Sequence, residues 1–181
     1  MFRGPVEVLC LVALLRLAAV PSALYGAGEF ADEPLVAALQ PFAFLLGEWD
    51  AVPGQSGETG GFTFKASAQG RVIVRTNFAS YPASAGKPAS RHDDFMVISV
   101  ERAAVHADYY DSEDHIIRYV GRSPAAGQVE FVSEVRSGEP RYRLRYSANP
   151  DGSLAGQFDV APPGKPDDFA RYLTWSARRR Q

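Results

Sequence analysis

The chain has 181 residues, of which 46% are hydrophobic, 12% aromatic and 22% charged. This composition excludes a disordered, collagen-like or coiled-coil chain, and it supplies enough apolar side chains for one compact domain with a short appendage. Lys and Arg number 19 against 21 Asp and Glu, which gives a formal net charge of -2. A balanced chain of this kind lacks the basic surface that nucleic acids and anionic membranes attract, so we expect no nucleic-acid partner.

Residues 1–26 have the pattern of an export signal peptide. Arg3 lies in a short N-terminal segment, an apolar stretch runs from Val8 to Val20, and small residues follow it. A basic start, an apolar stretch too short to span a bilayer and a small-residue exit are typical of such signals. We expect cleavage between Ala23 and Ala27 and a periplasmic or secreted mature chain without an integral membrane span. Because Arg16 interrupts the apolar stretch, a buried N-terminal helix is the alternative.

The only cysteine, Cys10, lies within this predicted signal. The residues before Cys10 do not form a lipobox, so we expect no lipid anchor. The mature chain would contain no thiol and would need no disulfide, which is compatible with an oxidising compartment.

A helical lead-in is expected over residues 27–46. Asp32 can cap a helix running from Glu33 to about Leu46, which Pro41 should break or bend. From Gly47 onward the hydrophobic period changes from helical to two, which indicates strands.

Ten short alternating segments separated by turn-forming residues follow Gly47. No gap between them is long enough for a crossover helix, so consecutive strands should pair antiparallel, and closure into a barrel removes unpaired edges. We therefore predict an all-β fold with one antiparallel meander barrel of about ten strands over residues 47–177, and a solvated basic tail over 178–181. The expected strands are Gly47–Val52, Gly61–Ser67, Val72–Tyr81, Asp94–Val100, Ala104–Asp111, His115–Gly121, Val129–Arg136, Arg141–Ala148, Ser153–Val160 and Phe169–Ser176.

One hairpin carries a ladder of arginines. Closing Val129–Arg136 on Arg141–Ala148 places Glu134 opposite Arg143 and Phe131 opposite Tyr146. One face is then aromatic, and the other carries three arginines (Arg141, Arg143 and Arg145) with Glu130 and Glu134. Opposite charges across a ladder stabilise an outer face, so we interpret these arginines as solvated, with an anion-binding strip as the alternative.

The start of the first strand resembles a known group of barrels. An apolar helix leads into Leu46-Gly47-Glu48-Trp49, which resembles the opening of calycin-type barrels, the lipocalin, fatty-acid-binding-protein and nitrobindin group. The resemblance implies that Trp49 packs across the closed end of the barrel, and that the barrel is a cup for a small, largely apolar molecule. It does not extend to haem, because nitrobindins supply a histidine near the C-terminus and the last histidine of this chain is His115. We therefore predict no cofactor.

Alternation within the strands predicts which residues line the cup. An interior of this kind is a ligand pocket or a filled core, since a barrel of about eight strands can be filled by side chains and ten leave some space. The predicted lining is Phe62, Phe64, Val72, Val74, Phe78, Tyr109, Tyr119, Phe131, Tyr142, Leu144, Tyr146, Phe158, Leu173 and Trp175.

The most informative polar set on one strand face comprises His106, Asp108, Tyr110 and Arg118. Pairing of the two strands places Asp108 opposite Arg118. If this face pointed inward, the four side chains could orient a ligand carboxylate or perform acid-base chemistry. Burial preference favours the opposite face as core, so we expect the set on the outer surface.

Other catalytic and metal-binding signals are weak. The chain has no HExxH or GxSxG motif, no phosphate-binding glycine loop and no cysteine pair. Arg91-His92-Asp93-Asp94 could offer ligands to a divalent cation, but neighbouring strand residues point to opposite faces, so we predict no metal site.

These observations favour an exported barrel that binds a small hydrophobic or amphipathic molecule in its lumen without catalysis. Two alternatives belong to other classes. One is a barrel enzyme, an isomerase, cyclase or hydrolase that uses the set around His106. The other is a structural or interaction module of the cell envelope with a filled core.

Overall fold

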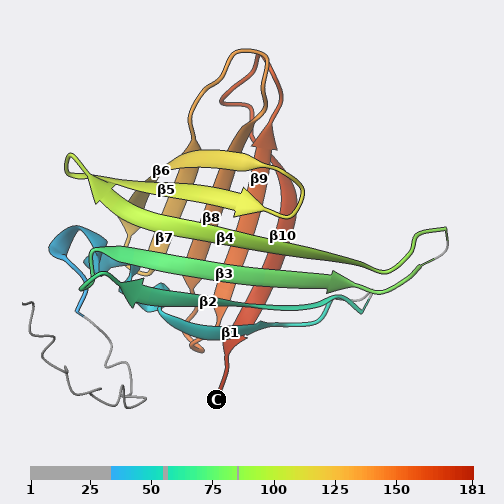
Figure 1. Ribbon diagram of the computed structural model, residues 1–181, viewed down its shortest axis with the longest axis horizontal. Coiled ribbons are helices and arrows are strands. Elements are labelled where there is room, and N and C mark those ends of the chain that lie inside the picture. Colours follow the sequence, from blue (N-terminus) through green and yellow to red (C-terminus); the bar gives the residue numbers. More distant parts are fainter. Residues whose placement is uncertain (1–33, 55–56, 85) are drawn as a thin grey trace, which may run out of the picture. The chain divides into compact units, whose positions relative to one another are not determined.

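The computed structural model describes residues 34–54, 57–84 and 86–181. The predicted signal peptide and the start of the lead-in lie outside these residues. The described part contains one short 3-10 helix, η1 (Ala37–Leu45), and ten strands, which confirms the predicted all-β class (Figure 1). The strands are β1 (Gly47–Ala51), β2 (Thr59–Ser67), β3 (Val72–Tyr81), β4 (Ser90–Glu101), β5 (Ala104–Asp111), β6 (Ile116–Ala125), β7 (Gln128–Ser133), β8 (Arg141–Ala148), β9 (Leu154–Ala161) and β10 (Ala170–Arg179).

The ten strands form one closed antiparallel barrel in which each strand pairs with its neighbours in sequence. The barrel closes at β1, where Trp49 lies opposite Phe62 of β2 on one side and Arg179 of β10 on the other. In Figure 1 the strands β2 to β5 cross in front of β7 to β10 at a steep angle, as expected for a small twisted barrel. The predicted meander and its closure are therefore confirmed.

Three strands, β3, β5 and β8, have the bounds predicted from the sequence. The turn between β5 and β6 includes Asp114 at a φ of 67°, a positive value that Asp tolerates better than most residues. The lead-in differs from the prediction, because it is a 3-10 helix that begins only at Ala37. Pro41 lies inside it and has no N–H, so a continuous α-helical hydrogen-bond pattern cannot pass through this residue.

The predicted register of the β7–β8 hairpin is wrong by two residues. Phe131 lies opposite Leu144, and Arg143 lies opposite Val132 rather than Glu134. The strand β7 ends at Ser133, three residues before the predicted end, although the backbone N–H of Glu134 still donates to the Arg118 carbonyl oxygen of β6 at 3.1 Å. A shift of two residues leaves every side chain on its predicted face, so the arginine ladder still lies outside.

The prediction of a basic tail over 178–181 is also wrong, because most of these residues are paired in the barrel. Arg178 and Arg179 belong to β10 and pair with β1, and the backbone N–H of Arg180 donates to the Glu48 carbonyl oxygen at 2.8 Å. The physical reason is closure, because β1 has an unpaired edge until these residues extend β10 alongside it.

One end of the barrel has a buried, apolar core. Leu39, Phe42 and Leu45 of η1 are at most 1% exposed and pack with the inward side chains of the sheet. Trp49 is buried beside them and donates its indole N–H to the Leu45 carbonyl oxygen at 2.8 Å. The Arg179 guanidinium lies 4.5 Å from the Trp49 ring centroid and donates to the Leu46 carbonyl oxygen at 2.8 Å. These contacts fix η1 to the barrel wall and close this end.

Candidate functional site

A charged pair lies inside the barrel. Ile73 and Arg75 of β3 are buried and share the inward face of the strand. The guanidinium of Arg75 forms an ion pair with the carboxylate of Asp94 on β4, and the two side chains are only 6% and 4% exposed. The side-chain amide of Asn77 donates to the second Asp94 oxygen at 2.7 Å. Burial of opposite charges is costly unless they are paired, and here the pairing is present.

Aromatic rings surround this pair. The Arg75 guanidinium lies 5.7 Å from the ring centroid of Phe62 and 6.0 Å from that of Phe64. The ring of Tyr146 meets Phe64 edge to face at 5.5 Å. Burial raises the pKa of Tyr146 to about 12 even though the positive charge of Arg75 acts against it, so the phenol is neutral at ordinary pH.

Two atoms of this cluster have unused hydrogen-bonding capacity. Among the described residues, the Nε–H of Arg75 and the hydroxyl of Tyr146 are buried without a hydrogen bond of ordinary geometry, although the Arg75 side chain lies close enough to act as a hydrogen-bond donor that works against the burial-driven rise in the pKa of Tyr146. Both residues are more than nine-tenths buried. Buried polar groups are almost always paired, and an unpaired one marks a place where another molecule can form the missing bond.

A chain of hydrogen bonds continues from this cluster towards solvent. His92 lies between Glu113, at 3.1 Å from its Nδ1, and Tyr109, at 3.2 Å from its Nε2. The Tyr109 hydroxyl donates to Asp111 at 3.3 Å, and Asp111 in turn contacts the ring of His115 at 2.9 Å. Burial and the neighbouring carboxylate of Asp94 raise the pKa of Tyr109. These residues come from β4, β5 and the β5–β6 turn, and they form part of the rim of the barrel.

The two halves of the interior differ in exposure. Most inward side chains near η1 are buried, with Ala66 and Val100 only partly so, and four inward aromatic residues in the other half are also partly buried. They are Tyr109, Tyr142, Phe158 and Trp175. Their side chains point into the barrel and are only partly buried, at the end of the barrel opposite η1. We call this end the open half, and Arg75 and Tyr146 lie at its base.

The structure places most of the predicted lining residues inside the barrel. The inward set includes Phe62, Phe64, Tyr109, Tyr119, Phe131, Tyr142, Leu144, Tyr146, Phe158 and Trp175. Leu173 lies opposite Phe158 but is 48% exposed.

The prediction for β3 is wrong, because Val72, Val74 and Phe78 share a strand face that points outward. Val74 lies opposite the exposed Lys65, and Phe78 packs under the Arg91 guanidinium at 4.6 Å. The apolar alternation of β3 is misleading because the inward face of this strand contains polar residues. Arg75 and Asn77 are tolerated there because both bond Asp94 of the neighbouring strand β4.

The sequence pattern therefore does not predict that Arg75 and Asn77 lie in the interior. It also does not predict that Asp94 faces inward. A cross-strand signal exists, since Asn77 lies opposite Asp94 and Arg75 opposite Met96 once β3 and β4 are paired. That signal depends on a register that the sequence alone leaves open.

The set around His106 lies on the outer surface, as burial preference predicts. Asp108 lies opposite Arg118 as expected, and their side chains form an ion pair of 3.7 Å while 49% and 66% exposed. Tyr110 is also exposed. The catalytic alternative requires this face to line the lumen. The observed placement on the outer surface does not meet that requirement.

The arginine ladder is neutralised on the outer surface. Arg143 and Arg145 both donate to Asp159 at 2.9 Å. Burial alone would raise the pKa of Asp159, but hydrogen bonds from Gln157 and Arg143 outweigh it and hold this pKa below its ordinary value. The predicted ladder partner Glu130 instead bonds Arg122 of β6.

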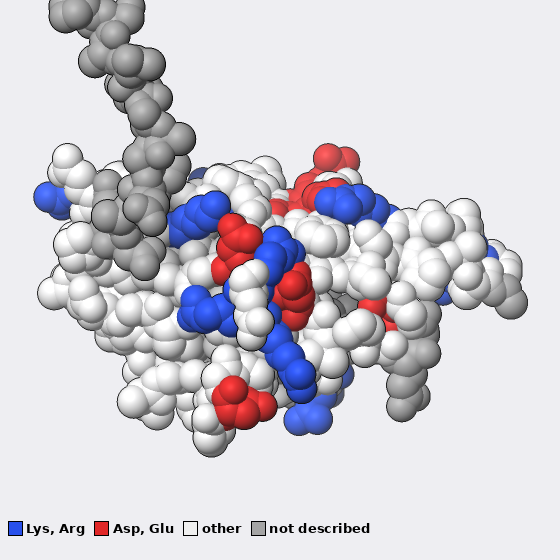
Figure 2. Space-filling model, turned by 90° about the horizontal axis from the view of Figure 1, so that it is seen from below, with Lys and Arg blue, Asp and Glu red and all other residues white. Residues whose placement is uncertain are grey.

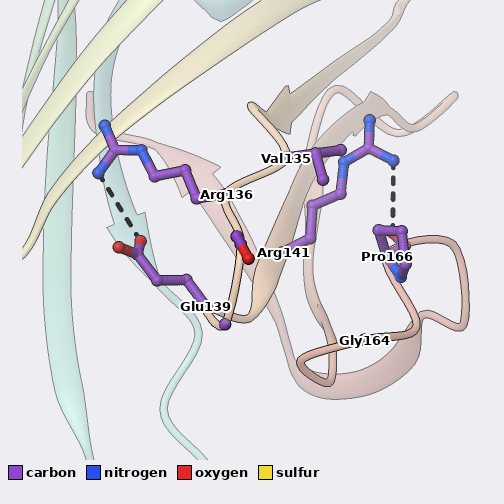
Figure 3. A pocket seen from close by; sticks show the side chains of 8 residues that line it. Val135, Arg136, Glu139, Arg141, Gly164 and Pro166 are labelled. Carbon is purple, nitrogen blue, oxygen red and sulfur yellow. Dashed lines mark hydrogen bonds and ion pairs between the residues drawn. The ribbon is translucent and has the colours of Figure 1, made fainter.

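The outer surface has two shallow pockets, and both are lined by residues already paired. One, of about 160 Å³, lies between the β7–β8 and β9–β10 loops, where Arg141 donates to the Pro166 carbonyl oxygen and Arg136 pairs with Glu139 (Figure 3). The other, of about 230 Å³, lies along β2 to β4 beside Arg91 and Asp93.

Basic and acidic side chains are interspersed on the face that Figure 2 shows, where the residues of β1 and the end of β10 lie. Arg180 bonds both Asp50 and Glu48 there, and Lys65 pairs with Glu48. Within residues 34–54, 57–84 and 86–181, no group of three His, Cys, Asp or Glu side chains is arranged to hold a metal ion.

No family model matches the chain, and no curated protein matches it. In the part of the chain that the structure describes, none of the helices has the length and apolar character needed to cross a bilayer. The geometry of the barrel interior is therefore the main evidence on function.

Proposed function

We propose that this chain is an exported binding protein that holds a small amphipathic molecule in the open half of its barrel and does not transform it. The observation that carries the proposal is the combination at the base of the open half. There, among the described residues, the buried Arg75 Nε–H has no hydrogen-bond partner, and the side-chain hydrogen bond that acts on the Tyr146 hydroxyl beside it comes from Arg75 itself. Above them, aromatic side chains that point inward still reach solvent. An apolar wall with a few convergent polar groups is the usual composition of a small-molecule site.

The difference in burial between the two halves of the barrel supports the same function. The half next to η1 is filled by side chains that are almost fully buried, and this half supplies a core. The open half retains exposed aromatic surface, and covering this surface with a ligand is favourable because it removes apolar area from water. The resemblance to calycin-type barrels, carried by Gly47 and Trp49, points to the same kind of cup.

Binding can be tested with N-phenyl-1-naphthylamine, a neutral apolar dye whose fluorescence rises in an apolar site. The wild-type protein should bind it saturably. Ala79 shares the inward face of β3 with Arg75 and lies opposite His92, whereas Ser80 points outward. We expect Ala79→Trp to fill the open half and weaken dye binding by about tenfold or more, since a filled pocket loses the apolar contact.

The same substitution on the opposite face, Ser80→Trp, should leave dye binding unchanged. A wild-type protein without saturable binding, or an Ala79→Trp variant that binds as well as Ser80→Trp, would refute the proposal. The first of these results would favour a structural module with a filled core.

Export has a separate test. Intact mass of the protein purified from its own host should correspond to a chain that starts between residues 24 and 28, if the signal is cleaved between Ala23 and Ala27. A mass that includes Met1 to Val20 would contradict the export proposal without affecting the binding proposal.

A further inference from the structure

The charges inside the open half restrict the chemistry of a ligand. Among residues 34–54, 57–84 and 86–181, the buried guanidinium of the interior is that of Arg75, and its charge is already matched by Asp94. A second carboxylate, Asp111, is only 4% exposed on the rim side. Two backbone N–H groups donate to it, and despite its burial these bonds hold the pKa of Asp111 below its ordinary value, so it is ionised at neutral pH.

The remaining titratable groups do not add a free positive charge. His92 lies between two carboxylates, 3.1 Å from Glu113 and 3.5 Å from Asp94, so a proton on its ring is matched as well. Burial raises the pKa of Tyr119 and of Tyr146, and both phenols are neutral at ordinary pH. His115 pairs with Asp111 and is itself half exposed to solvent. The interior as a whole is therefore neutral or negative.

The hydrogen-bonding groups that are left unused in the open half do not carry an unmatched charge. Arg75 Nε is an N–H donor, and the Tyr146 hydroxyl can donate or accept. A carbonyl, amide, ester or hydroxyl oxygen can accept from such donors without bringing a charge into the barrel. A carboxylate would bring a negative charge to a site whose only cation already has a partner, and an unmatched buried charge is costly.

We propose that the open half selects an uncharged amphipathic ligand, one with a carbonyl or hydroxyl head on an apolar body, and discriminates against the corresponding carboxylate. This inference rests on the proposed binding function. It assigns Asp94 as the specificity-determining residue, because Asp94 neutralises the charge of Arg75, whose Nε–H is buried without a partner among the described residues.

Two probes of equal chain length test the inference, dodecanamide and dodecanoate. Each is titrated against the wild-type protein loaded with N-phenyl-1-naphthylamine at neutral pH, where dodecanoate is ionised. We expect the amide to displace the dye at a concentration about tenfold or more below that of the carboxylate, because an unmatched charge weakens binding inside the barrel.

The variant Asp94→Asn should reverse this order, since it leaves the charge of Arg75 without a counter-ion and so favours dodecanoate. The matched control is Asp108→Asn, which makes the same change in the outer pair with Arg118 and should keep the wild-type order. If Asp94→Asn does not fold, the wild-type comparison decides by itself.

The outcomes separate the two proposals. Equal displacement by both probes, or stronger displacement by dodecanoate in the wild type, overturns the inference about ligand charge while the binding function stands. Absence of saturable dye binding overturns both. An Asp94→Asn variant that folds and keeps the wild-type order overturns the role assigned to Asp94.

Discussion

The buried pair of Arg75 and Asp94 allows a quantitative test of how the interior is built. Arg75→Met removes the guanidinium but keeps most of the length and apolar character of the side chain. The carboxylate of Asp94 then remains inside the barrel, with a side chain that is 4% exposed. Removal of one partner of a buried pair costs about 3–5 kcal/mol, because the other charge is left unmatched. We therefore expect the free energy of unfolding to fall by about this amount.

The double variant Arg75→Met, Asp94→Asn removes both charges together. The amide introduced at position 94 can still pair with the amide of Asn77, which in the wild type donates to Asp94 at 2.7 Å. With no unmatched charge left inside, the double variant should be more stable than Arg75→Met alone. The coupling energy from the double-mutant cycle should be about 2 kcal/mol or more, at the upper end of the range for residues in contact.

Urea unfolding followed by far-UV circular dichroism measures all four proteins of the cycle. The control is the same cycle on Arg118 and Asp108, whose side chains are 66% and 49% exposed and whose coupling should be below about 1 kcal/mol. The reasoning is refuted if the Arg75 and Asp94 substitutions are additive within about 0.5 kcal/mol, because additivity means that the two charges do not depend on one another inside the barrel.

Three other predictions concern the barrel as a whole. A Cβ atom added at Gly156 would overlap the indole of Trp175, so Gly156→Val should shift the tryptophan fluorescence and lower the free energy of unfolding by about 1–3 kcal/mol; an unchanged spectrum contradicts this. Arg179→Gln removes the guanidinium that lies 4.5 Å from the Trp49 ring and should cost about 1–2 kcal/mol in urea unfolding, whereas an effect of zero would mean that the stacking is incidental. Asp159 has a pKa below its ordinary value, so the unfolded chain binds more protons in acid, and the stability that this carboxylate supplies above its unfolded pKa is lost as pH falls through its folded pKa. Asp159→Asn should reduce this loss of stability in acid. Urea unfolding at several pH values measures the free energy of unfolding of both proteins, and an equal decrease with falling pH in both would disprove the prediction.

The sequence predicts the barrel well because strand alternation and turn residues are local. The strands β3, β5 and β8 have the predicted bounds, and the turn between β5 and β6 contains Asp114, a residue that tolerates the positive φ of 67° found there. The C-terminal arginines are mistaken for a tail because a strand rich in arginine lacks an apolar alternation. What places Arg179 in the sheet is the free edge of β1, a long-range feature that no local pattern contains.

The interior polar cluster is not predictable in the same way. In β3 the apolar residues Val74 and Phe78 lie outside, and the guanidinium of Arg75 lies inside. Local burial preferences assign the faces in the reverse order. The true assignment is favourable only because Asp94, from the next strand, neutralises the buried cation, and that pairing exists only once the register of β3 and β4 is fixed.

A buried ion pair seldom adds net stability to a fold, and an apolar pair of similar volume would often serve stability equally well or better. The fully buried core beneath η1 already provides apolar burial worth roughly 1.5–3 kcal/mol for each large side chain. The pair of Arg75 and Asp94 is therefore not needed to hold the barrel closed. Its position at the base of the open half, with Arg75 Nε unpaired among the described residues, is instead what a site requires when it must give direction to a hydrogen bond without presenting a net charge. On this argument, stability and the proposed binding function belong to opposite halves of one barrel.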